Sequence, residues 1–191
     1  MPPFLQDALD LARFRIKPLE HYSYDWWQPV GWLMLLSVLP VLGGSLPGFS
    51  LGQHLALAIG MNWFRVLFFV FFFGWWLRRT PAGQARLAGG SLFPLLVLLG
   101  SSDLLLPLLA NLPQGVGILM LLVLKGYQLG LALRALAVAT GNTVQQVALG
   151  TLLSIPVLLV VMLLLSILLS VAGVNPEQLL PRPAGAPKVV G

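Results

Sequence analysis

The chain of 191 residues contains no cysteine, and only 9% of its residues are charged. Without cysteine it cannot form a disulfide, a thiolate metal site or a cysteine nucleophile. Typical soluble domains carry about 25% charged residues, so this chain has too little charge for a soluble domain of its length. It also lacks the GxSxG, HExxH, GxGxxG and P-loop patterns of common enzyme and nucleotide sites. These absences exclude many soluble enzyme classes.

Apolar residues are abundant: they make up 58% of the chain, and the mean hydropathy is +0.89. A helix that spans a bilayer needs roughly 20 mostly apolar residues. The sequence therefore predicts an all-α, polytopic membrane protein with about five spans, each of roughly this length. The predicted spans are approximately Pro29–Leu46, Leu55–Leu77, Leu87–Leu109, Gly115–Val138 and Val147–Val174.

We expect three regions: an N-terminal segment (1–25), the membrane domain with the five spans (26–174) and a C-terminal tail (175–191). In the first, residues 4–17 predict an amphipathic helix lying in the membrane interface, with an apolar arc. Packing of this helix against the protein's own loops is an equal alternative. The proline-rich segment 175–191 predicts a disordered tail. The arc is formed by Phe4, Leu5, Ala8, Leu9, Ala12 and Ile16, while Asp7, Asp10, Arg13 and Lys17 lie mostly on the other side.

Lysine and arginine predict the orientation, because they concentrate in cytoplasmic loops. The N-terminal segment and the connection between the second and third spans are basic, whereas the loops after the first and third spans carry no cation. The pairs Trp26–Trp27 and Trp75–Trp76 then share one interface, as an aromatic belt does. We expect the N-terminus in the cytoplasm and the C-terminus on the opposite side. The basic pI near 10.3 indicates contact with anionic lipid rather than nucleic acid, since the cations flank apolar runs.

Histidine is scarce, and the two histidines, His21 and His54, are predicted on opposite sides of the membrane. Neither a two-histidine metal site nor a serine–histidine relay can then form. Asp103 is the only acid predicted deep in a span, so a carboxylate pair is excluded there. We expect no enzymatic activity, catalytic residue, metal or cofactor. The sequence shows no set of catalytic residues that would support a membrane enzyme acting on lipid.

The main candidate site is a polar cluster within the spans, centred on Asp103 in the stretch "LLGSSDLLLPLL". At about 1.5 Å per residue, Arg65 lies about 18 Å and Asp103 about 24 Å above the inner ends of their spans. Lys125 lies about 15 Å below the outer end of its span. The three charges therefore lie close enough in depth to meet, with Ser101 and Ser102 offering hydroxyl groups beside Asp103. A lone charge costs roughly 2.5–3.5 kcal/mol there, which pairing reduces.

This cluster has two interpretations. It can hold the helices together or recognise a partner helix, or it can serve as a proton or ion relay. One acid and two bases give no continuous path across the membrane, so we favour packing or partner recognition.

Gly126 and Gly130 follow Lys125 with GxxxG spacing, which lets another backbone approach closely. Packing inside the protein is the alternative use of this face, and Gly150 with Ser154 repeats the pattern. At the start of the fifth span, Thr143 and Gln146 have capping-box spacing.

The stretch "LKGYQLGLALRALAVATGNTVQQVALGTLLSIPVLL" resembles the fourth span, short polar turn and fifth span of the Yip-domain (Ypt-interacting protein) family. The resemblance is best over residues 87–171, and "YDWWQPVGWLM" stands where eukaryotic members carry a DLYGP segment, without its residues. Similar eukaryotic proteins associate with Rab-type GTPases in Golgi and ER membranes, and prokaryotic members share no assigned activity. The resemblance implies a five-span membrane protein and assigns no functional residue.

The leading hypothesis is a non-enzymatic scaffold or accessory subunit of the bacterial inner membrane. It would act through contacts between helices, with the lipid bilayer and either another membrane protein or a second copy as partners. The alternative is a small transporter or channel subunit that uses Arg65, Asp103 and Lys125 for translocation.

Overall fold

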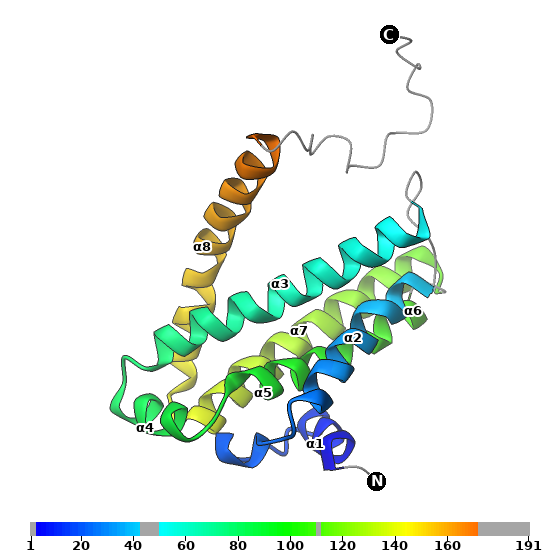
Figure 1. Cartoon of the computed structure of the whole chain (residues 1–191). Coiled ribbons are helices and arrows are strands. Elements are labelled where there is room, and N and C mark those ends of the chain that lie inside the picture. The colour runs from blue at the N-terminus through cyan, green and yellow to red at the C-terminus, as the bar shows by residue number, and fades with distance from the viewer. Residues whose placement is uncertain (1–2, 43–49, 110–111, 172–191) are drawn as a thin grey trace, which may run out of the picture.

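The computed structural model describes residues 3–42, 50–109 and 112–171, and within these ranges every regular element is helical (Figure 1). The prediction of an all-helical protein is therefore confirmed for this part of the chain. The predicted tail 175–191 lies outside the described residues. Three of the helices are long and apolar enough to cross a membrane. They make this a membrane protein, although the sequence predicts five spans.

The three long helices are α3 (Leu51–Leu77), α7 (Gln114–Thr140) and α8 (Val144–Val171). A helix of 27 residues is about 40 Å long, more than the roughly 30 Å of a bilayer's hydrocarbon core. Ser50 and Gln53 form a capping box at the start of α3. The predicted capping box before α8 is confirmed: the backbone nitrogen of Gln146 lies 3.3 Å from Thr143 Oγ1, and that of Thr143 lies 3.4 Å from Gln146 Oε1.

The turn between α7 and α8 requires glycine at one position. Gly141 has a φ of 69°, in the left-handed region that ends many helices. Next to it, the Asn142 amide oxygen accepts a hydrogen bond of 2.6 Å from Thr80 Oγ1, which precedes α4 (Pro81–Gly89). This hydrogen bond thus ties the turn to the start of α4.

The first predicted span corresponds to α2 (Trp27–Leu42), which packs against α3. Its 16 residues give about 24 Å, shorter than the hydrocarbon core. The end predicted at Leu46 lies outside the described residues.

The third predicted span, Leu87–Leu109, is not one helix, and the prediction of a continuous helix there is wrong. α4 ends at Gly89, and the next helical segment is bent from it by 92°. Ser91, a serine that the sequence analysis passed over, caps this new start by accepting a hydrogen bond from the Phe93 backbone nitrogen. The segment consists of α5 (Leu92–Leu99), the 3-10 helix η2 (Gly100–Leu105) and α6 (Leu106–Leu109).

The N-terminal helix α1 (Pro3–Ala12) is shorter than the predicted residues 4–17 and packs against α5 and α7. It is followed by Phe14, whose φ of 58° turns the chain, and by the 3-10 helix η1 (Leu19–Tyr22). Its buried residues are Phe4, Asp7 and Leu11. The assignment of Asp7 to the polar, outward side is therefore wrong.

The core lies toward the end of the bundle where α4 and α1 are found, at the base of Figure 1. From that end, α8 rises and diverges from the other long helices (Figure 1). Much of the apolar surface of α7 and α8 is accordingly uncovered, as expected for helices that face lipid. Side chains with no more than 1% exposure include Leu11, Leu19, Leu33, Leu77, Leu95, Val97, Ala135, Ala139 and Val147.

Candidate functional site

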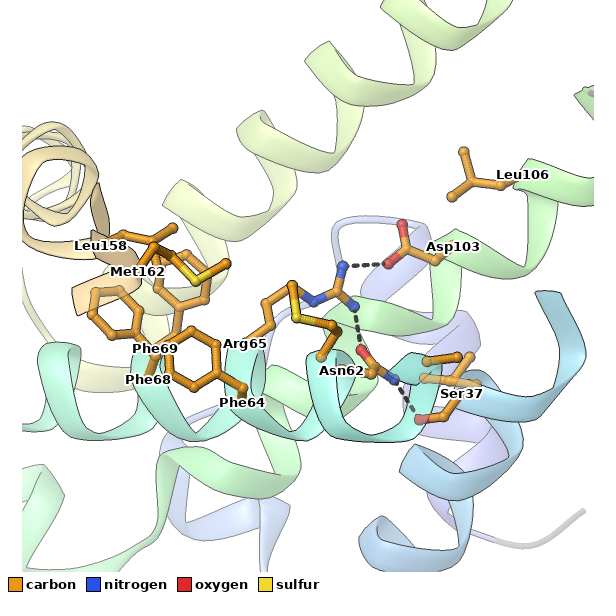
Figure 2. A pocket seen from close by; sticks show the side chains of 13 residues that line it. Ser37, Asn62, Phe64, Arg65, Phe68, Phe69, Asp103, Leu106, Leu158 and Met162 are labelled. Carbon is orange, nitrogen blue, oxygen red and sulfur yellow. Dashed lines mark hydrogen bonds and ion pairs between the residues drawn. The ribbon is translucent and has the colours of Figure 1, made fainter. Parts of the chain in front are cut away.

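Asp103, on η2, joins two other helices through its carboxylate. Oδ2 lies 2.9 Å from Nη1 of Arg65 on α3, and Oδ1 lies 3.4 Å from Nζ of Lys125 on α7 (Figure 2 shows the arginine side). The structure thus brings together the three charges that the sequence analysis places at similar depths. The 3-10 helix η2 begins at Gly100, directly after α5 ends at Leu99, and it positions Asp103 between α3 and α7.

Three polar side chains that the sequence analysis missed complete this cluster. Gln128 donates a hydrogen bond of 3.0 Å to Asp103 and accepts one of 2.9 Å from Lys125. Asn62 accepts a bond of 2.8 Å from Arg65 and donates one of 2.9 Å to the Ser37 hydroxyl on α2 (Figure 2). Asn62 precedes Arg65 by three residues and Gln128 follows Lys125 by three, a spacing that puts each pair on one helix face. That spacing is the sequence signal by which Asn62 and Gln128 could have been predicted as members of the cluster.

Ser101 and Ser102 direct their hydroxyl groups elsewhere. Ser101 Oγ accepts a bond of 2.8 Å from Nε1 of Trp32, and Ser102 Oγ donates one of 3.1 Å to the Leu99 carbonyl. The expected hydroxyl donors beside Asp103 are therefore used to hold η2 against α2 and α5.

The cluster is incompletely covered by the protein. The side chain of Asp103 is only 17% exposed, but those of Arg65 and Lys125 are 46% and 50% exposed. Two clefts, of about 400 and 300 Å³, flank the Arg65–Asp103 pair. The first is completed by Leu158 and Met162 of α8 (Figure 2). One carboxylate facing two cations leaves the cluster with a formal charge of +1.

The face of Gly126 and Gly130 is open. A Cβ atom at either position would meet nothing within 4 Å, so this glycine pair is not used for packing against the described parts of the chain. Gly150 differs, because a Cβ there would lie 2.6 Å from the Trp76 indole, and Ser154 is buried. Of the two small-residue patterns, the one on α8 packs internally and the one on α7 does not.

A second carboxylate cluster, which the sequence analysis missed, lies in the N-terminal segment. The buried Asp7 accepts a hydrogen bond from the Tyr24 hydroxyl, and its Oδ1 lies 2.6 Å from Lys17 Nζ and 3.2 Å from His21 Nε2. Burial raises the pKa of Asp7, but the bonds from Lys17 and Tyr24 and the interaction with His21 together lower it below its ordinary value. Burial of Tyr24 and the hydrogen bond from its hydroxyl to Asp7 raise the pKa of Tyr24.

Among the described residues, no group of three or more histidine, cysteine, aspartate or glutamate side chains could hold a metal ion. No family model, curated protein or solved structure matches the chain.

Proposed function

We propose that the chain is a membrane scaffold or accessory subunit that acts through contacts between helices, without enzymatic activity. The proposal takes up the function predicted from the sequence. It includes membership of the Yip-domain family and a place in the bacterial inner membrane. The observation that carries it is the exposure of Arg65 and Lys125, about half in each case, on two helices that are apolar enough to cross a membrane.

The physical argument concerns the surroundings of these cations. Bare charge at the depth of the hydrocarbon core costs about 2.5–3.5 kcal/mol for each residue, and Asp103 offsets only part of this cost for two cations. A helix seated beside the cluster would remove lipid from the exposed parts of both side chains. The open face of Gly126 and Gly130 lies on the same helix as Lys125, about a third of a turn around it, and would admit a helix closely.

The proposal includes five spans with a cytoplasmic N-terminus. The segment from Leu92 to Leu109 supports a broken span: its α-helical and 3-10 turns sum to about 30 Å, the thickness of the hydrocarbon core. α4 then lies across the membrane surface, and α1 lies at the interface while packing against the bundle. The exposed Trp26 precedes α2 and the exposed Trp75 lies near the end of α3. These two helix ends lie toward the base of Figure 1, which supports a common interface.

The test is partner capture with a variant that leaves the fold intact. Gly126→Leu adds a side chain whose Cβ atom meets nothing within 4 Å in the described part of the chain, and it raises helix propensity, so the chain should fold at least as well. We expect it to lose a reproducible partner, or self-association, in gentle-detergent purification from native membranes. Gly60→Leu on α3 is the matched control, because a Cβ there also meets nothing within 4 Å. Retention of every partner by Gly126→Leu would contradict the proposal.

A transporter or channel subunit is the second candidate, and the two clefts beside the Arg65–Asp103 pair favour it. Met61 lines one of these clefts, whereas Leu163 on α8 is exposed and lines neither of them. If water reaches the cluster, Met61→Cys should react with a membrane-impermeant thiol reagent and Leu163→Cys should not. The cysteine-free chain makes the assay specific. Equal lack of reaction at both positions would exclude this function.

A further inference from the structure

A third cleft, separate from the charged cluster, lies between α1, η2 and α7. Its volume is about 480 Å³, and its wall is almost entirely apolar. Leu5 and Ala8 contribute from α1, Leu105 from η2, and Leu124 and Leu131 from α7. An engineered apolar cavity of about 150 Å³ already binds benzene. This cleft is therefore large enough for part of a hydrocarbon chain.

The few polar atoms around the cleft are already paired. The Tyr127 hydroxyl donates to the carbonyl of Ala12, which fastens the end of α1 to α7. On the opposite wall, Trp32 Nε1 donates to Ser101 Oγ. With these groups satisfied, the interior offers only apolar contact, which favours an alkyl chain over a polar ligand.

Cations stand beside this cleft, toward the predicted cytoplasmic side. Arg134 follows Tyr127 by seven residues, two helical turns along the same face of α7, and lies about 9 Å from the end of the helix at Thr140. Its guanidinium carbon is 5.8 Å from the centre of the Phe14 ring, and that ring packs edge-on against Tyr127.

The chain neighbours of Phe14, Arg13 and Arg15, add two more cations at this end. Both side chains are exposed, as is that of Arg134. For these three arginines the structure shows no ion pair with any residue that it describes. An unneutralised basic group beside an apolar cleft is complementary to a ligand with an anionic head and an apolar tail.

We propose that this cleft binds an anionic phospholipid, with one acyl chain between α1 and α7 and the phosphate at Arg134. Each buried methylene contributes favourably to such binding, so a chain along the cleft supplies affinity. The arginine supplies the preference for an anionic head, and its long side chain reaches the headgroup level while its stem stays among apolar groups. The proposal is independent of any partner at Gly126.

The experiment is native mass spectrometry of the full chain in detergent, titrated with phosphatidylglycerol and with phosphatidylcholine of identical acyl chains. We expect the wild type to bind phosphatidylglycerol about fivefold more tightly, the factor expected from one cation near an anionic lipid. Arg134→Gln should remove most of that preference and leave phosphatidylcholine binding unchanged, while Arg134→Lys should retain most of it. Arg79→Gln, which removes an exposed cation placed over Trp75, is the matched control and should behave as wild type.

The acyl-chain part of the site has its own variant. Ala8→Phe fills the cleft and should weaken the binding of both lipids, whereas Ala56→Phe, on an exposed part of α3, should weaken neither. Equal wild-type affinity for the two lipids, or an unchanged preference in Arg134→Gln, would overturn the proposal. Arg134 is exposed, so the headgroup test remains decisive even if Ala8→Phe fails to fold.

Discussion

Asp7 and Asp103 are both carboxylates that contact two basic side chains, but they connect different parts of the molecule. The contacts of Asp7 reach Lys17, His21 and Tyr24, all within the N-terminal segment. Those of Asp103 reach α3 and α7, which are far apart in the sequence. The first cluster folds a local segment onto itself, while the second fixes how separate helices face one another.

The two clusters also differ in what surrounds them. The side chain of Asp7 is 5% exposed, less than the 17% of Asp103, so burial by the protein alone would make Asp7 the more costly residue to disturb. In our proposal, however, the partners of Asp7 lie at the membrane interface, where water is close. The partners of Asp103 belong to α3 and α7, which are long and apolar enough to cross the membrane. Lipid offers no hydrogen bond to an orphaned cation. We therefore expect depth in the membrane to outweigh burial within the protein.

Replacing Asp103 should have the largest effect. Asp103→Leu leaves Arg65 and Lys125 without a counter-ion, and we expect a loss of about 3 kcal/mol, the size found for broken buried pairs and unpaired membrane charges. Thermal unfolding in detergent would show it as a lowered midpoint. The double variant Asp103→Leu/Arg65→Leu should recover part of the loss, since one orphaned charge is gone. An unchanged midpoint in the single variant would mean that the cluster does not hold the helices.

Replacing Asp7 should have a smaller and more local effect. Asp7→Leu leaves the Tyr24 hydroxyl without its acceptor and leaves Lys17 paired with Asp10 alone. About 1–3 kcal/mol is typical for the loss of such a partner. Hydrogen exchange should become faster in α1 and η1 and stay unchanged in α3 and α7. Asp10→Leu is the matched control, because Asp10 contacts Lys17 at 3.3 Å and the other partners belong to Asp7. If Asp7→Leu proves more destabilising than Asp103→Leu, burial rather than membrane depth sets the cost.

Acid should weaken the Asp7 cluster without mutation. The pKa of Asp7 is lowered on folding, so its contribution is complete above the ordinary carboxyl value of about 4 and is lost as the pH falls through the lower, folded value. Below about pH 4 the protection factors of α1 amides should therefore drop. Asp7→Leu should lack this step. The same pH dependence in that variant would assign the effect to another group.

Sequence patterns predicted well where a feature depends on composition or on neighbours along one helix. The long apolar runs of α3, α7 and α8 and the capping box of Thr143 with Gln146 are such features. The break before Leu92 was missed, because the apolar run continues through Gly90 and Ser91 and hydropathy does not register a serine cap.

The same distinction explains the candidate site. Arg65, Asp103 and Lys125 stand out because each interrupts an apolar run, and estimates of depth alone were enough to suggest that they meet. Asn62 and Gln128 were less visible, since uncharged amides are not rare enough to draw notice. Asp7 could not be found in this way, because charges alternate throughout its amphipathic segment and its burial depends on how that segment folds back.

Of the three acids compared, we expect Glu20 to contribute least to stability. Its carboxylate lies 2.8 Å from Nη1 of Arg86 and links η1 to α4, so its geometry is as close as that of the other two clusters. Both side chains are nearly half exposed, however, and exposed pairs are weakened by water and screened by salt. Glu20→Gln should leave both the unfolding midpoint and the exchange of η1 unchanged. A loss comparable with that of Asp7→Leu would show that contact geometry, rather than surroundings, determines what each of these acids contributes.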